Sequence, residues 1–304
     1  MSQVRQTVQT RKGSPYIYLW AAGEWYCYNP ERMPLGGGAM GTVFKGYCCR
    51  TNELVAIKKV KEKYAASRFI RERAKMECGL AYRHPHMVEM IGYCEYAPDS
   101  GPVFIISKFV SGQNIDDFFG TFPFGPEKIE KICHAIYQVL DALDYLHSKG
   151  VVHKDIKPSN IMVEDGNNVR LMDLGIASSY CDPRQNMGFS GTPQYSAPEQ
   201  IMGKGDSMSS AVSPATDIYA LGITVYELIT GTNPYDFDSI KESVRHQIED
   251  PLPMDAGLPP SLMAVLSKAT AKRPCDRYQT AMEFKNAIQN SLMPKKTFFN
   301  RIFK

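Results

Sequence analysis

The sequence predicts an α+β fold in which a small strand-rich half, about residues 32–108, precedes a larger helical half, about residues 109–290. Two patterns indicate this order. The segments 42–47 and 53–58 alternate apolar and polar residues, which is typical of half-buried strands. The segment 127–148 instead carries apolar residues at helical spacing along its whole length. A strand-rich half joined to a helical half predicts a ligand cleft between them.

The first half also predicts a third strand and one helix. Residues 102–106 form a short apolar run closed by polar residues, as a strand would. Residues 64–83 contain glycine only at Gly79, and Met76 and Leu80 continue one apolar stripe along them. This pattern predicts a single helix over 64–83.

Helical patterns continue through the second half. The segment 217–230 is strongly apolar and stops at Gly231, a residue typical of a helix end. Proline-rich punctuation over 251–260 separates it from two later helices, predicted over 261–271 and 280–290.

The two ends of the chain lie outside this pattern. Residues 1–31 form an N-terminal extension, in which 16–20 and 25–28 predict a small hairpin that packs on the strand-rich half. Residues 291–304 form a basic, aromatic C-terminal tail. An ordinary tail is favoured there over a membrane-surface or docking role.

Composition excludes several classes of protein. With 43% hydrophobic residues, 22% charged residues and a net charge of +3, the chain is typical of globular proteins and shows no basic stripe for nucleic acid. No apolar run has the length of a transmembrane segment or the pattern of a secretory signal. The eight cysteines contain no C-x-x-C pair, which favours free thiols in the cytoplasm over disulfides or a zinc site.

A glycine-rich motif lies where two strands are predicted to join. Because glycine has no Cβ, its backbone can fold closely over a phosphate chain and direct N–H groups at the oxygens. Alone, the motif fits a plain turn equally well. A dinucleotide-binding fold is disfavoured because a strand, not a helix, follows the last glycine. The motif consists of Gly36, Gly37, Gly38, Ala39, Met40, Gly41 and Val43.

Lys58 ends the strand pattern of 53–58, seventeen residues beyond Gly41. A lone lysine at a strand end is normally a solvated surface group. One strand away from a glycine-rich loop, however, its ammonium group can bind the α- and β-phosphates of a nucleotide.

The segment 152–161 carries the most chemical information. Asp155 can accept or orient the proton of an attacking hydroxyl, and Lys157 can neutralise phosphoryl oxygens in the transition state. Asn160 offers a neutral oxygen to Mg²⁺, which prefers oxygen ligands. Thirteen residues further on, Asp173 begins a D-L-G string that is similar to the D-F-G of protein kinases, and this resemblance implies that Asp173 chelates the Mg²⁺ that bridges two phosphates.

In this order, the motifs resemble those of eukaryotic-type (Hanks-type) serine/threonine protein kinases over about residues 32–290. The string H-K-D-I-K-P-S-N is similar to the kinase catalytic loop, with Lys154 where arginine is usual. D-L-G at 173–175 is similar to D-F-G, and G-T-P-Q-Y-S-A-P-E at 191–199 resembles the end of an activation segment. Thr192 is typical of the serine/threonine type, and the whole pattern is similar to bacterial members.

This resemblance implies a bilobal protein-kinase-like fold and transfer of the γ-phosphoryl group from Mg²⁺-bound ATP to Ser/Thr hydroxyls of protein substrates, including the chain itself. It also implies a glutamate that holds Lys58. Glu72 is preferred because Met76 follows on its face, and Glu77 is the rival because its spacing from Lys58 is closer to that of the family. The adenine site would be formed by Leu35, Val43, Ala56, Ser107, Lys108, Phe109, Val110 and Met162.

Two structural roles and one regulatory question follow from the same resemblance. Glu199 should pair with Arg277, and Asp217 should hold the catalytic-loop backbone. Phosphorylation of the activation segment is as plausible as an unregulated loop, because Lys154 lacks the bidentate fork of arginine. The candidate acceptors are Ser178, Ser179, Ser190 and Thr192.

Two other functions remain open at this point. A pseudokinase would bind nucleotide or a partner without phosphoryl transfer, and a small-molecule kinase would use a similar scaffold. The segment 191–199 argues against the second, since it builds a groove for an extended peptide in similar proteins. The sequence leaves the oligomeric state open.

Overall fold

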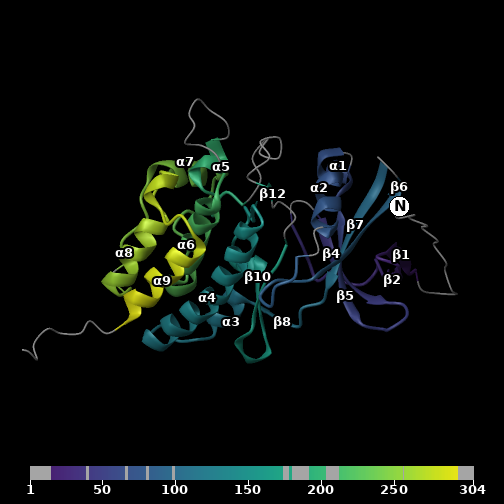
Figure 1. The fold of residues 1–304 in the computed structure, drawn as a ribbon, viewed down its shortest axis with the longest axis horizontal. Coiled ribbons are helices and arrows are strands. Elements are labelled where there is room, and N and C mark those ends of the chain that lie inside the picture. The colour runs from purple at the N-terminus through teal and green to yellow at the C-terminus, as the bar shows by residue number, and fades with distance from the viewer. Residues whose placement is uncertain are drawn as a thin grey trace, which may run out of the picture. The chain divides into compact units, whose positions relative to one another are not determined.

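In the computed structural model the chain forms two compact units. The first unit contains residues 1–112 together with 170–175, and the second contains residues 113–169 together with 176–304 (Figure 1). The structure describes residues 15–38, 41–65, 68–79, 82–97, 100–173, 178–179, 192–202, 212–255 and 257–293.

A seven-stranded antiparallel sheet forms most of the first unit. Six strands follow the order β1-β2-β4-β5-β7-β6, and the short β3 pairs with β4. Two helices, α1 (Glu62–Ala65) and α2 (Arg68–Gly79), come between β5 and β6 in the chain. The strands are β1 (Ile17–Ala21), β2 (Glu24–Tyr28), β3 (Gly36–Gly37), β4 (Gly41–Cys48), β5 (Leu54–Val60), β6 (Met90–Ala97) and β7 (Ser100–Lys108).

Alternation along the strands gives this sheet a buried cluster on each face. Ile57 and Phe104 belong to the cluster that β1 and β2 cover, whereas Val60 and Ile105 belong to the cluster shared with α1 and α2. The β1–β2 hairpin turns at Ala22 and Gly23, both with positive φ. The alternating apolar residues that predicted strands therefore serve two separate packing surfaces.

The helix predicted over 64–83 differs from the structure. The chain forms α1 and then α2, which ends at Gly79, a residue that favours helix ends. The buried side of α2 includes Arg71 and Ala74, with Cys78 half-buried. Its rotation follows from Arg71, which is 2% exposed and whose Nη1 donates to Glu95 Oε2 of β6 at 2.8 Å.

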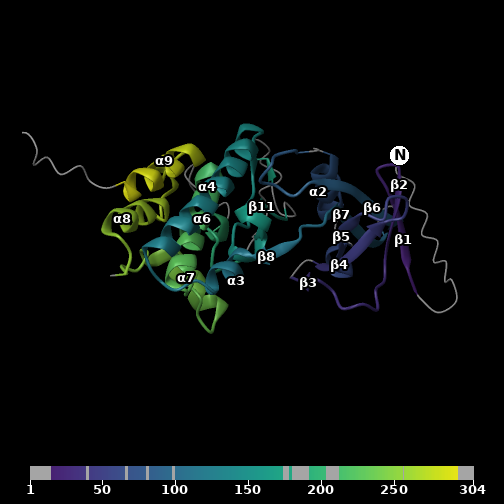
Figure 2. The same cartoon turned by 90° about the horizontal axis from the view of Figure 1, so that it is seen from below.

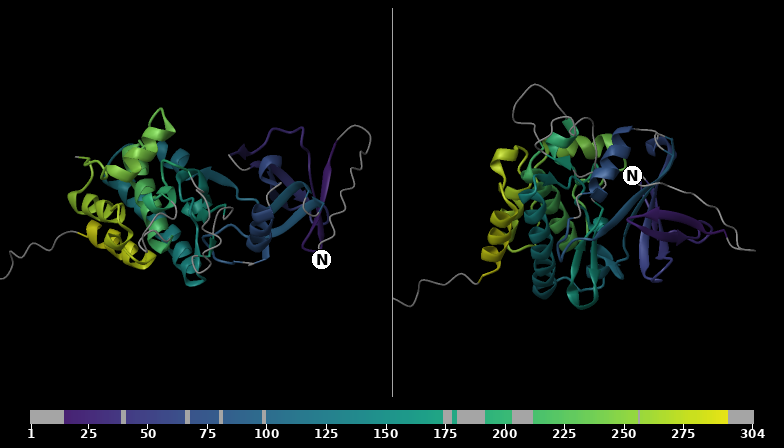
Figure 3. Two further views of the ribbon diagram at one scale, coloured as in Figure 1. Left: turned by 90° about the horizontal axis from the view of Figure 1, so that it is seen from above. Right: turned by 45° about the vertical axis from the view of Figure 1, so that its right-hand side comes forward.

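The second unit is mainly helical. Helix α6 packs against α4 and α8, and α9 packs against α4 and α8 (Figure 2). Figure 3 shows the same group of helices from two further directions. The helices are α3 (Ile115–Gly120), α4 (Pro126–Ser148), α5 (Pro198–Met202), α6 (Pro214–Thr230), α7 (Ile240–Glu249), α8 (Pro260–Ala269) and α9 (Ala281–Leu292).

Short elements carry the catalytic-loop sequence. The strands β9 and β10 flank a 3₁₀ turn at Pro158–Asn160, and β9 pairs with β12. A second small sheet has the order β11-β10-β8. The bounds are β8 (Gly112–Asn114), β9 (Val151–Val152), β10 (Ile161–Glu164), β11 (Val169–Leu171) and β12 (Ser178–Ser179), with further 3₁₀ turns at Asp165–Asn167 and Pro274–Asp276.

Helix α6 is the central helix of this unit. Almost all of its residues are buried, which agrees with its strongly apolar sequence. Ser213 and Thr216 form a capping box at its start, and Gly231 ends it with a φ of 82°. Even so, no helix in the described part of the chain combines the length and apolar character that crossing a bilayer requires.

Candidate active site

The described glycines of the glycine-rich motif lie in and next to β3 and β4, which pair in the first unit. The Gly38 N–H donates to the Gly41 carbonyl oxygen at 2.9 Å, and the Leu35 N–H donates to the Val43 carbonyl oxygen at 2.8 Å. At Gly41 a Cβ would lie 2.7 Å from the carbonyl oxygen of Lys59, so this position requires glycine. Ala39 and Met40 lie outside the described residues.

Lys58 and Asp173 come together in the first unit, although 115 residues separate them. The Lys58 Nζ donates to Asp173 Oδ1 at 2.7 Å and to Oδ2 at 2.6 Å. The two side chains are 17% and 38% exposed, so the pair lies partly open to solvent. Asp173 has a φ of 55°, a conformation that costs energy for a residue other than glycine. The structure thus joins the lysine expected at the phosphates to the aspartate expected at the metal.

The expected pairing of Glu72 with Lys58 is not present, and this prediction is corrected. The Glu72 carboxylate accepts from Arg68 Nε at 2.8 Å and is 57% exposed. The physical reason is the rotation of α2, whose buried side passes through Arg71 and Ala74 and leaves the neighbouring position 72 toward solvent. The side chain of Glu77, the rival candidate, lies outside the described residues.

The strand register places four of the expected nucleotide-site residues on one face of the sheet. Val43 lies opposite Lys58, and Ala56 lies opposite Ser107. Ala56 is buried, whereas Val43 and Ser107 are half-buried. This is the face of β5 and β7 that also carries Val60, Val103 and Ile105 toward α1 and α2.

The remaining adenine-site candidates differ in exposure. Leu35 is 49% exposed and Val110 is buried. Lys108 is exposed and pairs with Glu89 at 2.7 Å, while Phe109 lies under the ammonium group of Lys45. Met162 is half-buried and belongs to the second unit.

In the second unit, Asp155, Lys157 and Thr192 form a closed triangle of polar contacts. The Thr192 hydroxyl donates to Asp155 Oδ1 at 2.9 Å, and Lys157 Nζ donates to the Thr192 hydroxyl oxygen at 2.6 Å. Lys157 Nζ also lies 3.0 Å from Asp155 Oδ2. A carboxylate, a cation and a hydroxyl therefore lie within hydrogen-bond distance of one another. A carboxylate beside a cation is an arrangement that can orient a hydroxyl nucleophile.

Asn160 is turned so that its carboxamide oxygen suits a metal ion. Its Nδ2 donates to the Asp155 carbonyl oxygen at 2.7 Å and to Asp155 Oδ2 at 3.0 Å. Both amide hydrogens are thereby used, and the oxygen is the atom left for a hard cation. The Asn160 oxygen in the second unit and the Asp173 carboxylate in the first are each ligands that Mg²⁺ prefers.

Asp217 holds the catalytic-loop backbone from α6. Its carboxylate accepts the N–H groups of His153 and Lys154, both at 2.8 Å, and lies 2.8 Å from His147 Nε2. Complete burial acts to raise the pKa of Asp217, but the contacts with His147 and the backbone outweigh it and lower the pKa. Lys154 has a φ of 71°, and these bonds hold it in that strained conformation.

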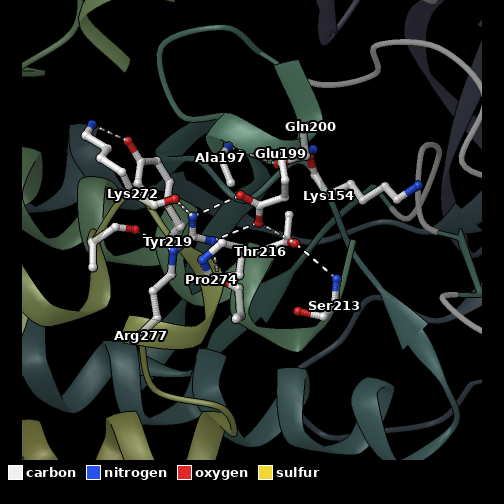
Figure 4. Close-up of polar contacts among 12 residues, drawn as sticks. Lys154, Ala197, Glu199, Gln200, Ser213, Thr216, Tyr219, Lys272, Pro274 and Arg277 are labelled. Atoms are coloured by element: carbon white, nitrogen blue, oxygen red, sulfur yellow. Dashed lines mark hydrogen bonds and ion pairs between the residues drawn. The ribbon is translucent and has the colours of Figure 1, made fainter. Parts of the chain in front are cut away.

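Glu199 and Arg277 form a buried bidentate ion pair (Figure 4). Arg277 Nη1 and Nη2 lie 2.8 and 2.9 Å from the two carboxylate oxygens. Thr216 of α6 donates to the same carboxylate at 2.8 Å. Beside it, Gln200 Nε2 donates to the Lys154 carbonyl oxygen at 3.0 Å, so the segment after Thr192 also contacts the catalytic loop.

Sequence reasoning missed some of these residues. His147 contacts Asp217 and Gln200 contacts Lys154, yet neither stands in a motif that was singled out. The usable signal was weak: His147 lies near the end of a predicted helix otherwise lined by apolar residues. Of the candidate phosphorylation sites, Ser178 and Ser179 form β12 and pair with β9, but their side chains and all of Ser190 lie outside the described residues.

Residues 30–291 match the family model described as the protein kinase domain. The chain belongs to that family, whose members use ATP and a divalent metal ion and act on proteins. The resemblance to Hanks-type kinases and the predicted α+β class are thereby confirmed.

Among individual proteins, the chain is similar to bacterial serine/threonine kinases. It is 35% identical to the serine/threonine-protein kinase PknB of Mycobacterium tuberculosis over 262 residues, which cover 83% of this chain and 41% of that protein. Identity to PknB of Mycolicibacterium smegmatis is 34%, with the same coverage. Identity to PknD of Mycobacterium tuberculosis is 32% over 267 residues, covering 85% of this chain and 39% of that protein. The chain thus spans about two fifths of the length of these relatives.

Proposed function

We propose that this chain transfers the γ-phosphoryl group of ATP to serine or threonine hydroxyls of proteins, including its own. The observation that carries the proposal is the triangle of Asp155, Lys157 and Thr192. The similarity to bacterial serine/threonine kinases supports it. The catalytic domain would span residues 32–290, with 1–31 as an extension and 291–304 as a tail.

Asp155 would orient the acceptor hydroxyl. The new bond joins the hydroxyl oxygen to the γ-phosphorus, while the bond from that phosphorus to the bridging oxygen breaks and ADP leaves with the electron pair. The hydroxyl proton passes to Asp155. The Thr192 hydroxyl already donates to Asp155 Oδ1, which supports a place for a hydroxyl donor there. Lys157 would neutralise the charge that develops on the phosphoryl oxygens.

Lys58 would bind the α- and β-phosphates, and the turn of Gly36 to Gly41 would direct N–H groups at the phosphate oxygens. Asp173 and Asn160 would hold Mg²⁺, which neutralises phosphate charge when bound. Glu77 replaces Glu72 as the proposed partner of Lys58. The adenine would contact Leu35, Val43, Ala56, Ser107, Lys108, Phe109, Val110 and Met162.

We place this activity in the cytoplasm, where ATP and reduced thiols are both available. In the described residues, Cys27, Cys48, Cys49, Cys78, Cys94, Cys133 and Cys275 are free thiols.

The test is phosphate incorporation from ATP and Mg²⁺ into the chain and into dephosphorylated casein. The parent would be compared with Asp155→Asn and Asp173→Ala, and Asp117→Asn would be the matched control because Asp117 is an exposed aspartate on α3. Mass spectrometry should find phosphoserine or phosphothreonine with the parent and the control. Each active-site variant should lose at least 100-fold in rate, because general-base or charge-stabilising groups contribute on the order of 10²–10⁴-fold.

Nucleotide binding separates this proposal from a pseudokinase. If the folded parent binds ATP in a metal-dependent way but transfers no phosphate, the proposal fails and a nucleotide-dependent binding module is favoured. Labelling of a metabolite in place of any protein would favour a small-molecule kinase.

A further inference from the structure

Gln247 of α7 is fully buried, and both the nitrogen and the oxygen of its side-chain amide form hydrogen bonds. Its Nε2 donates to the Gln194 carbonyl oxygen at 2.5 Å and to the Pro193 carbonyl oxygen at 3.3 Å. Its Oε1 accepts from the Tyr219 hydroxyl at 2.5 Å. A buried amide with donors and acceptor all used holds its neighbours in fixed places.

The other side of Gln247 is held by Lys272. Lys272 Nζ donates to the Gln247 carbonyl oxygen at 2.7 Å and to the hydroxyl oxygens of Tyr219 and Tyr235 at 3.1 and 3.2 Å. Arg277 Nη2 in turn donates to the Lys272 carbonyl oxygen at 2.8 Å. Figure 4 shows Lys272 and Tyr219 next to the Glu199–Arg277 pair. Gln247 is therefore linked through Lys272 to the buried Glu199–Arg277 ion pair.

The backbone that Gln247 contacts follows directly after Thr192 in the chain. Pro193 and Gln194 follow Thr192, whose hydroxyl contacts Asp155 and Lys157. Pro193 and Gln194 are half-buried, and a carbonyl group that is removed from water without gaining a donor costs free energy. The Gln247 amide supplies a donor to two successive carbonyls of this segment.

We propose that Gln247 is a positioning residue for the protein substrate. It holds the backbone of Pro193 and Gln194, so that an acceptor chain lying along this segment presents its hydroxyl to Asp155. The inference rests on the proposed function. Its effect falls on the protein substrate and not on ATP, because every described contact of Gln247 is with a residue of the second unit, whereas Lys58 and the glycine-rich motif belong to the first.

The experiment compares Gln247→Met with Ser243→Ala. Methionine is close to glutamine in length but cannot donate to the carbonyls, and its thioether sulfur is only a weak acceptor for the Tyr219 hydroxyl. Ser243 is the matched control: it is equally buried on the same helix, and its Oγ accepts from the Phe237 N–H at 3.3 Å. Kinetics with dephosphorylated casein should show a KM for casein at least tenfold higher for Gln247→Met, with the KM for ATP within twofold. Ser243→Ala should change neither.

A second measurement tests the positioning without relying on turnover. The N–H groups of Tyr195 and Ser196 donate to the Thr192 carbonyl oxygen at 3.0 and 3.1 Å. Their hydrogen exchange should be at least tenfold faster in Gln247→Met than in the parent or in Ser243→Ala.

The outcomes separate the two proposals. A parent that transfers no phosphate overturns the proposed function, while faster exchange in Gln247→Met would still support the held segment. A folded Gln247→Met with an unchanged casein KM and unchanged exchange overturns the positioning role. Equal rises in the KM values for casein and ATP, or an equal effect of Ser243→Ala, would also overturn it, because they indicate a general packing defect.

Discussion

Replacing Glu199 by Gln should destabilise the second unit strongly. The substitution keeps the shape of the side chain but removes the charge opposite Arg277, whose side chain is 0% exposed. Glu199 is also nearly inaccessible, at 2%. Arg277 would keep its bonds to the carbonyl oxygens of Ala271, Ala215 and Lys272, but its charge would have no carboxylate.

The expected loss follows from this burial. Removing one partner of a buried ion pair costs about 3–5 kcal/mol, because the remaining charge stays out of water. The bonds to three carbonyls favour the lower end of that range. The matched control is Asp276→Asn, since Asp276 lies 3.8 Å from Arg273 and both side chains are mostly exposed. An exposed pair of this kind contributes only about 0–1 kcal/mol.

Urea denaturation followed by circular dichroism at the helix band measures the effect. Most helices belong to the second unit, whereas Trp20 and Trp25, the only tryptophans, lie in β1 and β2 of the first unit. Helix signal and tryptophan fluorescence therefore report on different units. A helix midpoint for Glu199→Gln that matches Asp276→Asn would refute the reasoning. A double variant, Glu199→Leu with Arg277→Met, should recover part of the loss, because it removes both charges.

Three further predictions concern pH and ligand size. The lowered pKa of Asp217 stabilises the fold above its unfolded pKa of about 4, and this stabilisation is lost as pH falls through the folded value. Asp217→Asn should therefore flatten the acid side of a stability–pH curve measured by urea denaturation. Burial lowers the pKa of Lys272 to about 8, so the unfolded chain binds more protons above pH 8 and stability from this group rises there. Lys272→Met should abolish that rise between pH 8 and 9.5; an unchanged slope would contradict it. Ser107 belongs to the proposed adenine site, and its small side chain leaves room for a substituent on the adenine. Ser107→Met should therefore weaken binding of an N6-substituted ATP analogue at least tenfold, with ATP affinity within twofold by calorimetry.

Local sequence patterns predicted most elements of the fold. The long apolar periodicity of 127–148 became α4 with nearly the same bounds, because Pro126 can start a helix but cannot continue one. The strand signal at 53–58 became β5. By contrast, the pattern did not predict α7, which exposes Ile240 and buries Ser243 and Gln247. Ser243 and Gln247 are buried through polar contacts, and a search for apolar residues at helical spacing does not detect such contacts.

The residues of the candidate site also differ in the kind of sequence signal from which they were predicted. Lys58, Asp155 and Asn160 were predicted from an ordered set of short motifs, and their roles stay predictions. Glu72 was chosen from an apolar stripe, and the stripe misled because Arg71, a charged residue, occupies the buried side of α2. A buried arginine paired with Glu95 is a tertiary contact, so no count of apolar positions could have predicted the rotation of the helix.

Residues at the start of α6 connect parts of the proposed catalytic site that lie far apart in the sequence. Asp217 holds the backbone of the catalytic loop, while Thr216 contacts the Glu199 carboxylate. Two residues beyond Asp217, Tyr219 contacts Gln247, and through it the backbone after Thr192. These three side chains project from one buried turn of α6. A shift of α6 would therefore move Asp155 together with the backbone of Pro193 and Gln194. The geometry at Asp155 therefore depends on packing around one apolar helix, so the core of the second unit would contribute to the proposed catalytic site.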